Sequence, residues 1–119
     1  MTTTQSVLTA VADRFGIALR EVATGGGAVA LHARLESGQW LVASDECLMT
    51  LASRIALETV TDADGETRPA GWSVGIYPHN PETELWFGAD SVVDVSDYDA
   101  YAADLPDMVG RALSALVNL

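Results

Sequence analysis

The stretch AVALHARLESGQWLVAS, residues 28–44, decides which class of fold the chain can adopt. Apolar and polar side chains alternate along its first part, which is the period of a β-strand with one buried face. The turn signal Ser-Gly-Gln follows, and residues 40–44 return as a second apolar strand. The two faces of the first strand carry Val29, Leu31, Ala33 and Leu35 on one side and Ala30, His32, Arg34 and Glu36 on the other. The stretch predicts an antiparallel hairpin, with His32 at the surface.

Before this hairpin, the sequence predicts an amphipathic helix near the N-terminus. Its apolar positions recur at helical spacing, at Val7, Leu8, Val11, Ala12 and Phe15. Thr3 or Thr4 is suited to the N-cap, and Gly16 is suited to the left-handed position just beyond the last turn. Residues 17–22 then predict a strand that leads toward the hairpin.

After the hairpin, residues 44–60 favour a short helix that passes into a strand near Arg54. A polar, turn-rich loop follows at residues 61–71. Alternation of apolar and polar side chains then returns in residues 72–78, and an apolar segment resumes at residues 84–88. These two segments predict a second hairpin.

The last segment, residues 97–116, predicts a helix. At about 100° per residue, one side collects Tyr98, Tyr101, Ala102, Leu105, Met108, Val109, Ala112, Leu113 and Leu116. The other side collects Asp97, Asp99, Asp104, Asp107, Arg111 and Ser114. We therefore expect both tyrosines in the core and the aspartates in solvent. Pro106 predicts either a kink or a short helix followed by a longer one that has Pro106 in its first turn.

Together these elements predict one α+β domain that spans residues 1–119. An antiparallel sheet of about five strands is flanked by an N-terminal and a C-terminal amphipathic helix, with a short middle helix between them. A chain of 119 residues has the size of one domain. It buries about 65% of the surface that its unfolded form exposes, which is enough for one hydrophobic core.

The chain is strongly acidic, with a net charge of −11 that is unevenly distributed. Residues 1–60 carry six acids and four arginines, whereas residues 61–119 carry eleven acids and two arginines. Such a field repels nucleic acid and anionic membranes and attracts basic protein surfaces. We expect a basic protein surface as the partner, with no direct contact to nucleic acid and no membrane. A purely solubilising surface stays open as the alternative interpretation.

Other features bear on location and origin. No apolar run approaches the roughly 18 to 20 residues of a membrane span. The first residues, MTTTQSV, lack the basic region of a secretory signal, and the single cysteine excludes an internal disulfide. These features predict a cytoplasmic protein. All six basic residues are arginines, which is typical of a GC-rich genome such as that of an actinobacterium or one of its phages.

The sequence lacks the motifs of common metal, cofactor and catalytic sites. Loops that start at Asp62 and Asp97 miss the spacing of a calcium-binding EF-hand. A looser divalent site around Asp62, Asp64 and Glu66 stays open beside the interpretation as a polar turn. The two histidines and one cysteine do not form a zinc pattern, and Cys47 is expected to be a small buried residue. No cofactor and no catalytic residue are therefore predicted.

An exposed aromatic side chain beside an acidic surface is typical of a protein-binding patch. Trp86 and Phe87 fall on opposite faces of their segment, so one of them is expected to be exposed. The residues predicted to bind a partner are Trp86, Phe87, Asp90, Asp94, Asp97, Asp104 and Asp107. The broad apolar stripes of the two terminal helices further predict a homodimer.

The order of elements resembles the type III secretion chaperone and YbjN-like fold. The segments that carry the resemblance are VLTAVADRFGIAL (residues 7–19), ALHARLESGQWLVA (residues 30–43) and LPDMVGRALSAL (residues 105–116). The resemblance implies a protein that binds other proteins without catalysis, often as a dimer.

The leading hypothesis is therefore a non-enzymatic acidic protein-binding module, such as an adaptor, chaperone or inhibitor encoded by a phage. The alternative is an inhibitor that mimics nucleic acid and occupies a DNA-binding or host-defence protein. Duplex DNA carries one charge per roughly 1.7 Å, and the aspartates of residues 90–107 are the candidates for a comparable row. A small enzyme is the third hypothesis.

Overall fold

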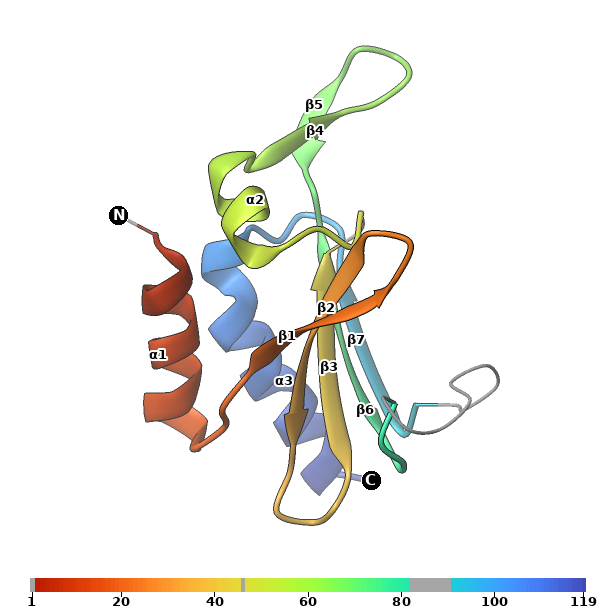
Figure 1. The fold of residues 1–119 in the computed structure, drawn as a ribbon. Helices are drawn as coiled ribbons and strands as arrows, with labels where there is room; N and C mark the ends of the chain where they lie inside the picture. Colours follow the sequence, from red (N-terminus) through yellow and green to blue (C-terminus); the bar gives the residue numbers. More distant parts are fainter. Residues whose placement is uncertain (1, 46, 82–90) are drawn as a thin grey trace.

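The computed structural model describes residues 2–45, 47–81 and 91–119, and it has the predicted α+β fold (Figure 1). Its helices are α1 (Thr4–Phe15), α2 (Leu51–Ala56), the 3-10 helix η1 (Ala102–Asp104) and α3 (Leu105–Val117). Its strands are β1 (Arg20–Gly25), β2 (Ala28–Arg34), β3 (Trp40–Asp45), β4 (Thr59–Thr61), β5 (Thr67–Pro69), β6 (Trp72–Tyr77) and β7 (Val93–Asp97).

The main sheet has five strands in the order β1-β2-β3-β6-β7, and each neighbouring pair is antiparallel. The predicted hairpin is confirmed as β2 and β3, with Leu31 opposite Ala43. β4 and β5 form a separate small hairpin, which projects from one end of the molecule (Figure 1). Residues 72–78 were correctly assigned to a strand, but the described partner of β6 on this side is β7. Residues 84–88 lie outside the described residues.

The ends of α1 follow the predicted signals. The Thr3 N–H donates to Ser6 Oγ at 2.8 Å, and the Ser6 N–H donates to Thr3 Oγ1 at 3.0 Å, which forms a capping box. Gly16 has a φ of 68° and donates its N–H to the Ala12 carbonyl, which ends the helix. Local sequence is enough to set this helix because both of its caps lie within the segment itself.

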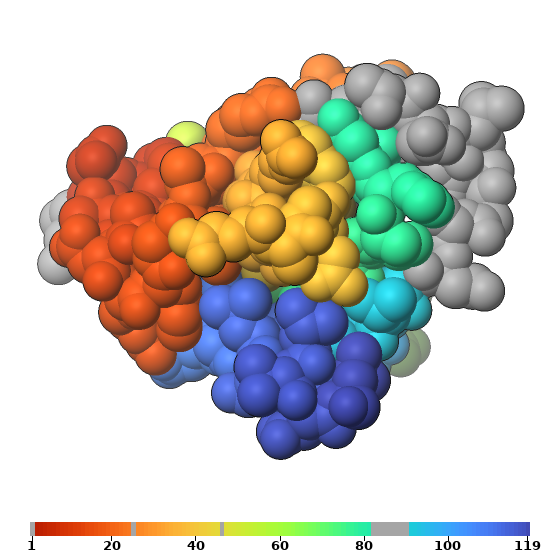
Figure 2. Space-filling view, turned by 90° about the horizontal axis from the view of Figure 1, so that it is seen from below, coloured from red at the N-terminus to blue at the C-terminus, as the bar shows by residue number. Residues whose placement is uncertain are grey.

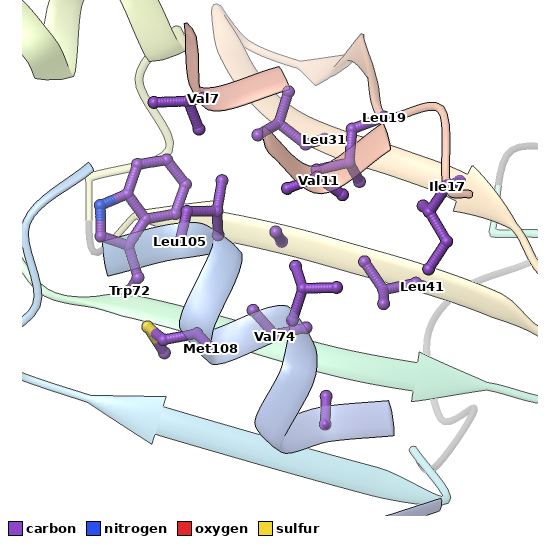
Figure 3. Close-up of a cluster of buried hydrophobic side chains, with 14 of the residues drawn as sticks. Val7, Val11, Ile17, Leu19, Leu31, Leu41, Trp72, Val74, Leu105 and Met108 are labelled. Atoms are coloured by element: carbon purple, nitrogen blue, oxygen red, sulfur yellow. The ribbon is translucent and has the colours of Figure 1, made fainter. Parts of the chain in front are cut away.

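The core lies between the helices and one face of the sheet. Trp72 and Val74 of β6 pack with Leu105 and Met108 of α3, and Val11 of α1 joins them (Figure 3). Figure 2 shows α3, in blue, lying along one side of the strands. Both terminal helices therefore use their apolar stripes on the same sheet face, and none of the described helices lies on the opposite face.

The predicted helix over residues 97–116 begins too early. Val93 and Val95 alternate with polar residues and pair with β6, so the chain is a strand as far as Asp97. A turn and η1 follow, and α3 begins at Leu105 with Pro106 in its first turn. Of the two outcomes predicted for Pro106, the structure has the short helix followed by a longer one.

The segment between β3 and β4 is also shifted from its prediction. β3 continues through Asp45, and the short helix α2 begins only after Thr50, whose Oγ1 accepts the Ser53 N–H. A strand, β4, does follow the helix, but it begins at Thr59, and Arg54, where the change to a strand was expected, lies inside α2. Cys47 is exposed, which contradicts the expectation of a buried thiol, because the connection that contains it lies at the surface.

Candidate functional site

Residues 97–104 form a turn between β7 and α3, which we call the acidic turn because it contains Asp97, Asp99 and Asp104. The Asp99 N–H donates to Asp97 Oδ1 at 2.9 Å, which reverses the chain after β7. η1, at the end of this turn, contacts α2. Figure 1 shows the turn at the end of the molecule that carries α2 and the β4–β5 hairpin.

Gly71 holds the acidic turn against the sheet. Its φ is 84°, and its N–H donates to the Ala100 carbonyl at 3.3 Å. A Cβ at this position would lie 3.1 Å from Tyr98 Cα, so the two backbones approach too closely for a side chain. The position of the turn is therefore set by a residue that is distant in the sequence.

The acidic turn exposes two tyrosines that the helical pattern predicted to be buried. Tyr98 is 75% exposed and Tyr101 is 39% exposed. The expectation is wrong for both because the chain at these positions is a turn, whose side chains do not follow a helical face. The Tyr101 N–H donates to Asp104 Oδ2 at 2.9 Å, which places an acid directly beside the second tyrosine. Leu105 and Val109 are buried as predicted, and Leu113 packs against the core while partly buried.

The four described aspartates among the predicted binding residues do not form one row. Asp107 Oδ1 lies 2.9 Å from Arg14 Nη1, and Asp97 Oδ2 lies 3.6 Å from Arg111 Nη1. Asp104 and Asp107 are exposed as expected, whereas Asp97 is half-buried. Asp94 lies on the opposite face of β7 from Asp97, because the two residues are an odd number of positions apart along the strand. Trp86, Phe87 and Asp90 lie outside the described residues.

A second polar and aromatic surface lies on the sheet face that the described helices leave uncovered. Cross-strand register places Arg34 of β2 beside Trp40 of β3, and Trp40 beside Tyr77 of β6. The next row on this face carries Arg20, His32, Val42, Gly75 and Asp94. We call this surface the open sheet face.

His32 is 2% exposed, which contradicts its predicted surface position. It lies on the polar face of β2, but β2 is an inner strand, so Arg20 and Val42 flank it on both sides. The alternation correctly assigned His32 to its face. It did not show that this part of the face would be buried.

Tyr77 lies flat on the open sheet face. A Cβ on Gly75 would lie 2.9 Å from Tyr77 Cε2, so the glycine leaves the space that the ring occupies. Burial raises the pKa of the Tyr77 hydroxyl above its ordinary value, and the nearby charge of Asp94 raises this pKa further. The Tyr77 hydroxyl is therefore neutral over the physiological range.

The described residues contain no group of three or more histidine, cysteine, aspartate or glutamate side chains that could hold a metal ion. Asp62 Oδ1 instead accepts the N–H groups of Asp64 and Glu66, each at 3.0 Å, which closes the β4–β5 turn. These hydrogen bonds are those of a polar turn, which is one of the two interpretations given above for Asp62, Asp64 and Glu66. Among the described residues, no helix is long and apolar enough to cross a membrane.

The sequence analysis predicted neither the acidic turn nor the open sheet face, because the sequence signal for each was short or incomplete. The signal for the acidic turn was the alternation in residues 93–97 followed by the Asp-x-Asp spacing, which is short and also fits a helical pattern. The signal for the open sheet face was the polar side of β2, which needed β6 and β7 to complete it. Comparison with protein-family models, curated proteins and solved structures found no match for this chain.

Proposed function

We propose that the chain is a non-enzymatic protein-binding module whose acidic turn contacts a basic surface of another protein in the cytoplasm. The observation that carries the proposal is Tyr98, which is 75% exposed and lies between two aspartates. Tyrosine is enriched at protein interfaces because it adds a large contact area and a hydroxyl at low entropic cost.

The acids of the turn give the surface its preference for a basic partner. Asp99 and Asp104 are exposed, and within the described ranges neither forms an ion pair with an arginine. Their charges are therefore available to steer a basic protein and to fix its orientation. Asp97 and Asp107 contribute less, since each already lies close to an arginine.

The nucleic-acid mimic is less well supported by this arrangement. A mimic of a phosphate row needs its charges on one surface, and Asp94 and Asp97 lie on opposite faces of β7. The chaperone, adaptor and inhibitor roles are all compatible with a tyrosine-containing acidic surface.

The test is affinity purification from the native cell with quantitative mass spectrometry. The wild-type chain is compared with a Tyr98→Ser, Tyr101→Ser variant and with a control variant, Val117→Ser, which changes a residue that is 82% exposed at the end of α3. We expect a basic protein that the wild type and the control recover and the tyrosine variant loses. Equal recovery by all three proteins would contradict a role of the acidic turn.

A further inference from the structure

The thioether of Met49 lies against the buried ion pair that joins β3 to α2. Arg54 Nη2 donates to Met49 Sδ at 3.0 Å, and Arg54 is paired with Asp45. Arg54 and Asp45 are buried, whereas Met49 is only half-buried. The sulfur atom of Met49 therefore connects an enclosed pair of charges with the surface of the protein.

The backbone next to Met49 is held in a strained conformation. Leu48 has a φ of 55°, in the left-handed region where the Cβ of a leucine crowds the following carbonyl oxygen. Two hydrogen bonds hold this loop in place. The Met49 N–H donates to Asp45 Oδ1 at 3.1 Å, and the Leu48 carbonyl accepts the Val29 N–H at 2.8 Å. A displacement of Met49 is therefore expected to weaken the contact between this loop and β2.

We propose that Met49 is an oxidation site, at which hydrogen peroxide converts the thioether to a sulfoxide and loosens the connection between β3 and α2. A lone pair of Sδ forms the new S–O bond while the O–O bond of the peroxide breaks. The sulfur is oxidised, and the departing hydroxide takes the proton of the transferred oxygen and leaves as water. The product is a polar group that methionine sulfoxide reductases return to the thioether.

The short contact to Arg54 makes oxidation of this methionine costly for the fold. An N–H···O hydrogen bond alone spans about 2.9 Å, so the 3.0 Å between Met49 Sδ and Arg54 Nη2 leaves no space for an oxygen between them. The new oxygen either pushes the sulfur away from Arg54 or points elsewhere and leaves an electron-poor sulfur beside the guanidinium. In both cases Arg54 loses an acceptor in an enclosed site. Because α2 contacts η1, the change also reaches the end of the acidic turn.

The fold makes the oxidation selective. Met108 is the other methionine among the described residues, and it is 1% exposed in the core. Peroxide reaches Met108 only when the fold opens, whereas the half-buried Met49 is accessible in the folded protein. Cys47 is exposed and its thiol also reacts with peroxide, so the test uses a chain in which this thiol is absent.

Peroxide treatment of the full chain with Cys47→Ser tests the proposal, with the same chain that also carries Met49→Leu as the matched control. Leucine keeps the size and apolar character of the side chain but has no sulfur. Peptide mass mapping should find the added oxygen at Met49 about tenfold sooner than at Met108. The Tm should fall by about 5 °C or more. The Val29 amide should exchange with solvent about tenfold faster, because its acceptor lies in the displaced loop.

The treated Met49→Leu chain should keep its Tm and the slow exchange of Val29, since every other oxidisable group is the same in the two chains. Equal rates of oxidation at Met49 and Met108 would overturn the proposal. So would a chain whose Met49 is fully oxidised but whose Tm and Val29 exchange are unchanged, or an equal loss in the treated control. No binding partner takes part in this experiment, so its result is independent of the function proposed for the acidic turn.

Discussion

Arg54 Nε lies 2.9 Å from Asp45 Oδ2, and the two side chains are 2% and 0% exposed, so α2 is joined to the end of β3 by a buried ion pair. Both side chains of the pair also form hydrogen bonds to the backbone. Asp45 Oδ1 accepts the N–H groups of Cys47 and Met49, and Arg54 Nη1 donates to the Leu57 carbonyl at 2.9 Å. The pair thus shapes the connection between β3 and α2.

Breaking this pair is expected to destabilise the protein strongly. Arg54→Met leaves the Asp45 carboxylate buried without its cation, which costs about 3–5 kcal/mol of unfolding free energy. Urea unfolding followed by circular dichroism measures this. The matched control is Arg14→Met, which removes the exposed ion pair with Asp107 and costs at most about 1 kcal/mol. Similar losses in the two variants would show that the Asp45–Arg54 pair is not enclosed.

The structure lowers the expected cost of a substitution at Tyr98 and keeps the cost expected at Met108. Met108→Ala removes a fully buried side chain and is expected to cost about 2–5 kcal/mol. Tyr98→Ala removes an exposed side chain and is expected to change stability by less than about 0.5 kcal/mol. Chemical denaturation measures both, and a large loss from Tyr98→Ala would restore the helical interpretation of the turn.

Gly65 and Gly71 have nearly the same φ, so a comparison of alanine substitutions at the two positions distinguishes backbone strain from steric contact. Gly65 has a φ of 81° with open space around its missing Cβ, whereas the missing Cβ of Gly71 would lie 3.1 Å from Tyr98 Cα. Gly65→Ala is expected to cost about 1–2 kcal/mol, the strain of a left-handed alanine. Gly71→Ala is expected to cost more and to displace the acidic turn. Thermal unfolding and amide chemical shifts of residues 97–101 measure the two effects, and equal costs would contradict the close approach.

The raised pKa of Tyr77 predicts a loss of stability at alkaline pH. Its pKa in the folded state lies above the ordinary 10.0, so the neutral hydroxyl contributes stability that is fully present below pH 10.0 and is lost as the pH rises through the folded-state pKa. Near-ultraviolet titration should show a tyrosine that ionises late, at a pH above 10.0. Tyr77→Phe should remove that late step, and Asp94→Asn should move it to lower pH without abolishing the shift, because burial is the larger cause. A titration curve that Tyr77→Phe leaves without the loss of a late step would contradict this.

Much of the fold could be predicted because its signals are local. The β2–β3 hairpin joins two alternating segments across a short turn, and α1 carries both of its caps within its own segment. The hydrophobic stripe of α3 from Leu105 onward was correct for the same reason, since helical contacts join residues three or four apart. The α+β class follows from the order of such segments.

Only the tertiary structure decided where the strand β7 ends and which polar residues become a surface. Five residues that alternate, such as Val93–Asp97, fit a strand or the start of a helix equally well until β6 supplies the hydrogen-bonding partner. Gly71 then fixes the turn that exposes Tyr98, and His32 is buried on a face that its own strand marks as polar. The sequence by itself determined the elements whose contacts are close along the chain. The acidic turn and the open sheet face required contacts between distant residues, whose pairing depends on how all the strands pack together.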